Sequence, residues 1–448
     1  LDADLRQLQH RHWHAAPLLA DGDAPADRNV SLPVSNPADR NDLVGSVTEA
    51  SPADVDRAIA AAAAFAADWH AVPPSRRAAL LRACADAFEA HRSELIALCI
   101  REAGKTWPNA VAEIREAVDF CRYYAARIVR LASPDAAPGV VACISPWNFP
   151  LAIFVGEISA ALAAGSPVLA KPAEQTPLTA ALAVHLLHAA GVPRAALQLL
   201  PGQGERVGAA LVADPRIRGV VFTGSTEVAR LIHRQLAQRP PEAPPTRLIA
   251  ETGGQNAMIV DASALPEQVV QDALASAFDS AGQRCSALRV LCLQEEIADR
   301  VIELLAGAMM ELTIGNPARL STDVGPVIDD TARAALLAHI DRLRTIGHRV
   351  IQCPLPDACA TGSFVPPTLI EIDSIAELER EVFGPVLHVL RYHAGRLDEL
   401  IDTINATGYG LTFGMHSRID ESIAHVVHRL RAGNLYINRN IVGAVVGV

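Results

Sequence analysis

Apolar positions between residues 51 and 131 recur with the spacing of amphipathic helices. Ser51 and Pro52 form an N-cap and first-turn pair, with Asp54 at the third helical position and an alanine-rich run after it. Further helical runs cover 76–103 and 109–131, and Gly104 is suited to end the first of them, because glycine adopts the left-handed conformation of helix C-termini. The pattern predicts a helical N-terminal region.

From Gly139 onward, short apolar runs alternate with helical stretches, and Gly165 and Gly191 are suited to end two of the helices. This alternation predicts β-α units on parallel sheets. The strand-like runs are 140–144, 167–170, 197–200, 219–222 and 248–250, then a second series from about 256 with 288–293, 386–390 and 411–415, and helices near 266–280 and 329–344. The proline-rich stretches 133–138 and 240–245 predict loops.

Composition narrows the functional classes. Half of the 448 residues are apolar and 20% are charged, which favours a large ordered core with more than one domain. The net charge of -11, without a dense basic run, argues against nucleic acid as a partner. We find no apolar stretch long enough for a membrane span and no signal peptide, so we expect neither membrane insertion nor export.

Eight cysteines are scattered along the chain, with no CxxC pair and no Cys/His cluster at metal-ligand spacing. This usage favours a reducing cytoplasm and predicts no metal site. The chain has no initiator Met and ends abruptly, so we expect it to be a piece of a longer protein.

Cys285 and Glu251 lie in expected loops, where reactive side chains are common. Cys285, in Gly-Gln-Arg-Cys-Ser, lies between a helical run and a strand-like run, and a nucleophilic thiol there would need a helix end or a positive charge to ionise it. The alternative is an inert thiol. Glu251 ends the run 248–250, ahead of two glycines that permit close approach of a ligand. It is a candidate general base; the alternative is a solvated turn carboxylate.

Three other loops could bind an anion or a nucleotide. Asn148 follows the strand-like run 140–144 and could donate to an oxyanion, or only stabilise a turn. Lys171 and Glu174 could bind a ribose, or form an ordinary ion pair. Gly224 and Ser225 precede a helix, where backbone amides and a hydroxyl can bind phosphate, although an N-cap explains the serine equally well. The glycines of Gly-Gln-Gly at 202–204 are only a weak nucleotide signal.

Taken in order, six motifs resemble the aldehyde dehydrogenase superfamily across residues 35–440. They are Pro-Trp-Asn-Phe-Pro at 146–150, Lys-Pro-Ala-Glu at 171–174, Phe-Thr-Gly-Ser at 222–225, Glu-Thr-Gly-Gly at 251–254, Gly-Gln-Arg-Cys at 282–285 and Glu-Val-Phe-Gly-Pro at 381–385. The resemblance implies an α/β fold with a Rossmann-like NAD-binding lobe and an α/β catalytic lobe. We expect N-terminal helices and the NAD-binding domain at 1–250, the catalytic domain at 251–432, and a return segment at 433–448 towards a truncated oligomerisation region.

The resemblance also implies roles. Cys285 would attack an aldehyde, with Asn148 and the Cys285 N–H holding the oxyanion, and Glu251 would activate the water that hydrolyses the thioester. This general base argues against a coenzyme A-acylating enzyme. The cofactor NAD would be bound by residues that include Lys171 and Glu174 at the adenosine ribose, Ser225 at the pyrophosphate, Glu381 and Phe383 at the nicotinamide ribose, and also Gly224 and Trp147.

A narrower resemblance is to the dehydrogenase module of bifunctional proline utilisation flavoproteins. It rests on the segments 101–106, 118–124, 249–256 and 284–289. It implies oxidation of L-glutamate γ-semialdehyde, formed by hydrolysis of pyrroline-5-carboxylate, to L-glutamate. Ser286 would then hold the substrate α-carboxylate, Glu113 its ammonium group, and Phe149 would be a further substrate residue.

Several features depart from that module. The glycine-rich loop expected after Val448 is absent, the segment between Tyr124 and Gly139 is short for the oligomerisation hairpin, and no flavin module precedes Leu1. We expect an upstream proline dehydrogenase flavin module and a homo-oligomer in the intact protein. Two alternatives stay open: a generic aldehyde dehydrogenase with another substrate, and a non-catalytic structural or partner-binding module that kept the fold.

Overall fold

A computed structural model describes residues 7–23, 31–131, 137 and 139–447. Contacts divide these into an N-terminal unit, drawn from Leu1–Asn36, Arg40–Thr252 and Val445–Val448, and a C-terminal unit, drawn from Pro37–Asp39 and Gly253–Ala444. The three-part division at 250 and 432 stays a prediction. By contacts, residues 433–444 group with the C-terminal unit.

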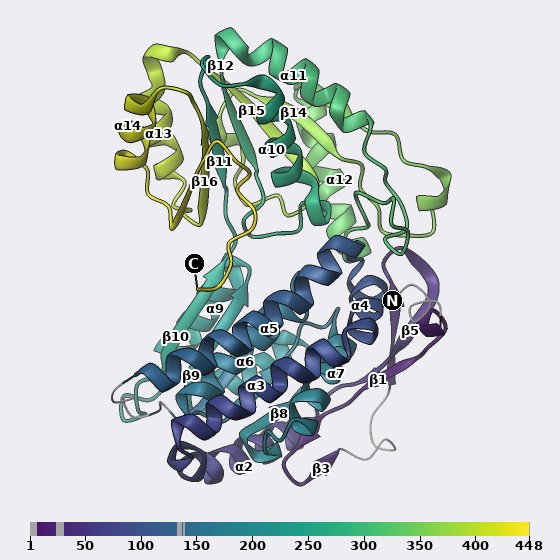
Figure 1. Ribbon diagram of the computed structural model, residues 1–448, viewed down its shortest axis with the longest axis vertical. Coiled ribbons are helices and arrows are strands. Elements are labelled where there is room, and N and C mark those ends of the chain that lie inside the picture. The colour runs from purple at the N-terminus through teal and green to yellow at the C-terminus, as the bar shows by residue number, and fades with distance from the viewer. Residues whose placement is uncertain (1–6, 24–30, 132–136, 138, 448) are drawn as a thin grey trace. The chain divides into compact units, whose positions relative to one another are not determined.

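Four long helices follow the first strands of the N-terminal unit, and two of them, α3 and α5, lie side by side (Figure 1). They are α2 (Pro52–Ala71), α3 (Pro74–Ala90), α4 (Arg92–Ala103) and α5 (Trp107–Arg130). The predicted start at Ser51 is confirmed, because its hydroxyl accepts from the Asp54 N–H and the Asp54 carboxylate accepts from the Ser51 N–H. Gly104 ends α4 with φ of 65°, as predicted. The single run predicted over 76–103 is wrong, since it breaks at His91 into α3 and α4.

The sheet of the N-terminal unit has five parallel strands in the order β10-β9-β6-β7-β8, which confirms the predicted β-α units. The strands are β6 (Val140–Ile144), β7 (Val168–Lys171), β8 (Leu197–Leu199), β9 (Ile217–Gly224) and β10 (Arg247–Thr252), and the helices between them are α6 (Ala152–Ala164), α7 (Pro177–Ala189), α8 (Ala209–Ala213) and α9 (Thr226–Ala237). From β6 the chain builds outward to β8 and then crosses to β9 on the other side. Doubly wound sheets bind ligands at the carboxyl ends of strands beside such a switch point.

Smaller strands complete this unit. The pair β2 (Leu18–Leu19) and β3 (Gly22–Asp23) extends the sheet beyond β8, and β1 (Trp13–Ala15), β5 (Asp39–Thr48) and β4 (Ser31–Asn36) form a separate three-stranded sheet. The apolar pattern predicted none of these five strands. The predicted loop at 240–245 is confirmed, and the one at 133–138 lies largely outside the described residues.

The C-terminal unit repeats the doubly wound plan, with strand order β13-β14-β15-β12-β11-β16-β17. Only β13 is antiparallel. The strands are β11 (Ala257–Val260), β12 (Val290–Gln294), β13 (Val350–Gln352), β14 (Thr368–Ile372), β15 (Val386–Tyr392), β16 (Thr412–His416) and β17 (Asn434–Ile437), and the helices are α10 (Pro266–Phe278), α11 (Glu295–Met310), α12 (Asp330–Thr345), α13 (Leu397–Ala406) and α14 (Asp420–Arg429).

Strands β11, β12 and β15 are almost wholly buried, so they form the centre of the apolar core of this unit. The helix predicted over 266–280 ends two residues early, at Phe278, because the chain turns into a left-handed conformation at Ser280. Within the described parts of the chain, no helix has the length and apolar character needed to cross a membrane.

Candidate active site

The loop that carries Cys285 begins with an unusual backbone turn. Ser280, Ala281 and Gly282 follow one another with positive φ angles of 56°, 53° and 64°. Residues other than glycine rarely adopt this region, and such conformations concentrate at functional sites. Gly282 is also required for space, because a Cβ there would lie 2.2 Å from the carbonyl oxygen of Gly384. The loop of residues 280–289, which we call the nucleophile loop after the role expected of Cys285, is therefore packed tightly against the loop at 381–385.

Cys285 differs from the other seven cysteines, all of which are buried, because its side chain is partly exposed. Its carbonyl accepts a hydrogen bond from Asn256 Nδ2 at 2.7 Å, which ties the loop to the start of β11. Burial raises the pKa of the Cys285 thiol, and the charge of Glu381 raises it further, whereas the Ser286 N–H and the charge of Arg289 lower it. The thiol is therefore mainly protonated at neutral pH and needs a base to become a nucleophile.

Arg289, at the end of the same loop, is completely buried and contacts both loops. Its guanidinium donates to the carbonyl oxygens of Gly282 at 2.7 Å and Arg284 at 3.0 Å, on the nucleophile loop. It also donates to Glu381 Oε1 at 3.1 Å and lies 5.2 Å from the centre of the Phe383 ring. The structure thus brings Glu381 and Phe383, two residues predicted at the cofactor, against the nucleophile loop.

Ser286 takes part in fixing the loop through its backbone. Its carbonyl accepts from Thr412 Oγ1 at 3.3 Å, at the start of β16. Its side chain is partly exposed.

In the N-terminal unit, Trp147, Asn148 and Phe149 follow β6 at the switch point of the sheet. Lys105, which is buried beside α5, donates to the Asn148 carbonyl at 2.5 Å and lies 4.6 Å from the centre of the Phe149 ring. Asn148 is 7% exposed. The cation fixes the backbone of this loop, which leaves the Asn148 amide group positioned by a rigid support.

Glu113 lies close to the same loop but carries structural contacts. It is 1% exposed, forms an ion pair with Lys105 at 3.3 Å, and accepts from the backbone N–H groups of Leu151 and Ala152 at the start of α6. A carboxylate at a helix N-terminus satisfies donors that the helix leaves unpaired. Its proposed contact with a substrate ammonium group stays a prediction.

Lys171 and Glu174 meet just after β7. Lys171 Nζ lies 2.8 Å from Glu174 Oε1, and the Gly204 N–H donates to the same oxygen at 2.6 Å. Burial alone would raise the pKa of Glu174, but the charge and hydrogen bond of Lys171, with the Gly204 N–H, lower it on balance. The structure therefore brings an anionic carboxylate and a buried cation together with the Gly-Gln-Gly segment.

Gly224 and Glu251 lie on the neighbouring strands β9 and β10, and Ser225 directly follows β9. Gly224 ends β9, and Ser225 caps α9 by accepting from the Val228 N–H at 3.2 Å. Glu251 pairs in register with Thr223 and is exposed. The N-cap alternative for Ser225 is therefore confirmed, which leaves its role towards phosphate a prediction.

Glu157, on α6, joins the strand ends beneath this site. It accepts from Ser145 Oγ at 2.6 Å and from Thr223 Oγ1 at 2.8 Å, beyond β6 and at the end of β9. Burial raises its pKa to about 8. Glu157 therefore joins the two sides of the switch point, and no sequence motif indicated it.

Two further polar groupings lie elsewhere in the C-terminal unit. His348, Asp373 and Glu377 form a cluster whose ligand atoms lie within 4.8 Å of one another. Glu377 caps a short helix there, because Oε1 accepts from the backbone N–H groups of Asp373 and Ser374 and Oε2 lies 2.5 Å from His348 Nε2. These contacts explain the cluster without a metal ion.

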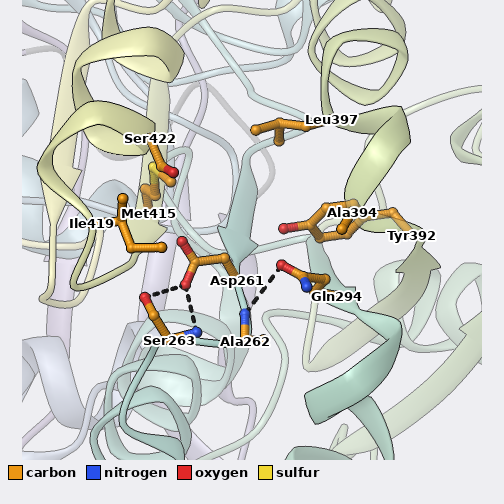
Figure 2. Close-up of a pocket in the computed structure, with 10 residues that line it drawn as sticks. All are labelled: Asp261, Ala262, Ser263, Gln294, Tyr392, Ala394, Leu397, Met415, Ile419 and Ser422. Carbon is orange, nitrogen blue, oxygen red and sulfur yellow. Dashed lines mark hydrogen bonds between the residues drawn. The ribbon is translucent and has the colours of Figure 1, made fainter.

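The second grouping lines a cavity of about 230 Å³ at the carboxyl ends of β11, β12, β15 and β16 (Figure 2). The nucleophile loop lies at the other end of the sheet, because it directly precedes β12. Asp261 Oδ1 accepts from the N–H and hydroxyl of Ser263, and Oδ2 accepts from Ser417 Oγ. Gln294 accepts from the Ala262 N–H at 3.1 Å. The polar side chains here stabilise the loops that follow the strands.

Lys105, Asn256 and Arg289, like Glu157, are not among the predicted site residues. Lys105, Asn256 and Arg289 each belong to a segment that resembles the proline utilisation module, but nothing in the pattern indicated what they contact. Asn256 and Arg289 directly precede apolar runs, where a polar side chain is expected to be hydrogen-bonded, but nothing of this kind marks Lys105. Each of the three stabilises a loop that carries a predicted site residue.

Comparison with known proteins places these features in a family. The aldehyde dehydrogenase family model matches residues 24–447. The bifunctional protein PutA of Klebsiella aerogenes is 57% identical over 456 residues, which cover all of this chain and 34% of that protein. The chain thus spans about a third of the length of the bifunctional relatives it matches.

Relatives of similar length also match. The 1-pyrroline-5-carboxylate dehydrogenase of Geobacillus kaustophilus is 34% identical, with 99% of this chain and 89% of that protein covered. A crystal structure of 1-pyrroline-5-carboxylate dehydrogenase from Thermus with bound NAD has a TM-score of 0.93 and 32% identity, and the match covers all of this chain and 89% of that one. By its family model, its relatives and its fold, the chain is a member of the aldehyde dehydrogenase family.

Proposed function

We propose that the chain oxidises L-glutamate γ-semialdehyde to L-glutamate with NAD as the oxidant. The observation that carries this proposal is the partly exposed Cys285, placed on a loop with three consecutive positive φ angles that Arg289 ties to Glu381 and Phe383. Relatives named 1-pyrroline-5-carboxylate dehydrogenase and PutA support the substrate. The bound NAD in the Thermus structure supports the cofactor.

The chemistry begins when the Cys285 thiol gives its proton to solvent water and Sγ attacks the aldehyde carbon. The new oxyanion accepts hydrogen bonds from Asn148 Nδ2 and the Cys285 N–H, which stabilise the charge that develops on oxygen. NAD, held by Lys171, Glu174, Ser225 and Glu381, would supply the hydride acceptor that oxidation of the Cys285 thiohemiacetal to a thioester requires. Glu251 then takes a proton from water, the hydroxide adds to the thioester carbon, and the C–S bond breaks to release the carboxylate and the Cys285 thiolate.

The residues that we expect to bind the nucleotide fit such a cofactor. The paired Lys171 and Glu174, at the end of a parallel strand, offer a cation and a carboxylate to ribose hydroxyls. The N-terminus of α9 at Ser225 offers backbone N–H groups to a pyrophosphate. We assign Glu381 to the nicotinamide ribose and Phe383 to packing beside it, with Gly224 and Trp147 as further contacts.

The anionic Glu174 predicts a preference for NAD over NADP, because a 2'-phosphate would meet a carboxylate that Lys171 and Gly204 hold in place. We expect kcat/KM to be at least about a hundredfold higher with NAD, equivalent to roughly 3 kcal/mol. In the Glu174→Gln variant, the ratio of kcat/KM with NAD to kcat/KM with NADP should fall about tenfold. Glu242→Gln, which changes a residue on an exposed loop, should leave this ratio unchanged. Equal kcat/KM for the two cofactors in the parent enzyme would refute the assignment.

Substrate selectivity is assigned mainly to Ser286, with Phe149 and Glu113 as further residues. A serine hydroxyl can donate to the substrate α-carboxylate, so Ser286→Ala should raise KM for glutamate semialdehyde by about tenfold and leave KM for propanal nearly unchanged. Steady-state kinetics with both aldehydes measures this difference. Equal increases for both would show that the serine acts on the loop and not on the carboxylate.

The proposal as a whole is tested by NADH formation with a panel of aldehydes. We expect glutamate semialdehyde to have the highest kcat/KM among substrates that include propanal, hexanal and succinate semialdehyde. A higher value for an uncharged aldehyde would favour a generic aldehyde dehydrogenase. No NADH with any aldehyde, from a folded chain that binds NAD, would favour a non-catalytic module.

We also propose that the chain works beside a proline dehydrogenase flavin module in a longer cytoplasmic protein. The fusion is supported by the PutA relatives, of whose length the chain spans about a third. The cytoplasm is supported by the described cysteines, which are all free thiols. The mass of the natural protein, measured after purification from its source, tests the fusion.

A further inference from the structure

We propose that Arg289 is a positioning residue that couples the nucleophile loop to the loop carrying Glu381. The inference rests on the proposed function, because it takes Cys285 as the nucleophile and Glu381 as a cofactor ligand. Its evidence, however, is the geometry of one side chain. The coupling makes the reactivity of Cys285 depend on Glu381, and the position of Glu381 depend on Arg289.

The contacts divide evenly between the two loops. Arg289 Nη1 donates to the Gly282 carbonyl at 2.7 Å and to the Gly384 carbonyl at 3.2 Å, so a single nitrogen joins them. Nη2 donates to the Arg284 carbonyl at 3.0 Å and to Glu381 Oε1 at 3.1 Å, so the second nitrogen does the same. A planar guanidinium has several donors in fixed directions, and a lysine ammonium group cannot reproduce this arrangement.

Close packing makes the two loops move together. Gly282 approaches Gly384 so closely that a Cβ would lie 2.2 Å from the carbonyl oxygen, and a Cβ on Gly253 would lie 1.6 Å from Glu381 Oε2. Glu381 is therefore confined between a glycine and the guanidinium. A shift of Arg289 would displace the carboxylate and the carbonyls of the nucleophile loop at the same time.

The charges of Glu381 and Arg289 also connect these two residues to Cys285. Glu381 and Arg289 act on the Cys285 thiol in opposite senses, because the carboxylate raises the thiol pKa and the guanidinium lowers it. Arg284, the other cation on the loop, is paired with Asp279 at 2.8 Å. While Arg289 stays beside Glu381, its charge offsets part of the unfavourable effect of the carboxylate on a thiolate.

The backbone of Arg289 is in turn held by the buried His388. Its backbone carbonyl accepts from the His388 N–H at 3.0 Å, and His388 Nδ1 lies 3.0 Å from the same oxygen. His388 is fully buried on β15 and its Nε2 lies 2.9 Å from His339 Nε2 on α12. Burial lowers the pKa of His388 to about 3, so this support is uncharged at neutral pH. The support therefore keeps the same charge across the pH range of an alkylation assay.

The test measures alkylation of Cys285 by iodoacetamide, followed by mass spectrometry of the peptide that contains it. Arg289→Lys should slow alkylation at pH 7.5 by about tenfold and move the pH profile upward, because the charge no longer lies against Glu381. Glu381→Gln should move the profile downward by about one pH unit and speed alkylation at pH 7.5. Arg300→Met, which removes an exposed arginine on α11, should leave the profile unchanged.

The double variant Arg289→Lys/Glu381→Gln decides between coupling and two separate effects. If the residues are coupled, the effect of Arg289→Lys on the alkylation rate should be at least about fivefold smaller in the Glu381→Gln background. Additive effects, or profiles that match the parent for both single variants, would overturn the proposal. Should Arg289→Lys fail to fold, an unchanged profile in Glu381→Gln would overturn it alone.

This experiment needs neither an aldehyde nor turnover. If glutamate semialdehyde is not the substrate, the alkylation results still stand. If the alkylation results fail while the enzyme oxidises glutamate semialdehyde, only the role of Arg289 is lost.

Discussion

Replacement of Cys285 by alanine should abolish NADH formation with every aldehyde, a loss of at least about a thousandfold in kcat. The expected loss is this large because no other described cysteine could substitute: the remaining seven are buried, and burial raises the pKa of each thiol. Initial rates at saturating NAD and aldehyde, with product measured at 340 nm, give the change in kcat.

Two controls separate lost chemistry from lost structure. Cys359→Ala removes a buried thiol on a short helix in the same unit and should keep kcat within about twofold. The thermal midpoint of Cys285→Ala should match that of the parent within a few degrees, because the removed thiol is only partly buried. A folded Cys285→Ala variant that still produced NADH at a tenth of the parent rate would rule out the thioester mechanism.

Much of the fold could be predicted because it follows from local chemistry. The capping residues Ser51 and Asp54 and the stop at Gly104 act within one helical turn, and buried parallel strands such as 140–144 are continuous apolar runs. The strand orders could not be read from the sequence, because each order depends on crossings between distant segments. Strands β1–β5 lack the clear periodicity of apolar residues from which a strand is predicted.

The candidate site divides in the same way. Cys285, Asn148 and Glu251 could be singled out because each lies in a motif at the end of an element. The contacts that hold these residues in place could not be predicted. Lys105 reaches the Asn148 carbonyl across 43 positions, and Arg289 reaches Gly384 across 95, so these contacts exist only in the folded chain. The left-handed turn at Ser280 and Ala281 was missed because neither residue type favours it.

Exchange of Glu251 for glutamine should separate the two halves of the proposed reaction. Glutamine cannot take a proton from water, so hydrolysis of the thioester should slow by about a hundredfold to ten-thousandfold while its formation continues. We therefore expect a burst of about one NADH per active site, followed by slow turnover. Stopped-flow absorbance at 340 nm measures the burst, and the mass of the intact chain should rise by that of the acyl group.

The outcome distinguishes a general base from a residue that only shapes the loop. Glu251 is exposed and pairs in register with Thr223 across β9 and β10, so glutamine preserves the strand and its backbone hydrogen bonds. Glu242→Gln, on the exposed loop before β10 in the same unit, is a matched control that should show no burst and keep kcat. If Glu251→Gln lost the burst together with steady turnover, the carboxylate would act before the thioester forms. Another group would then have to activate the water.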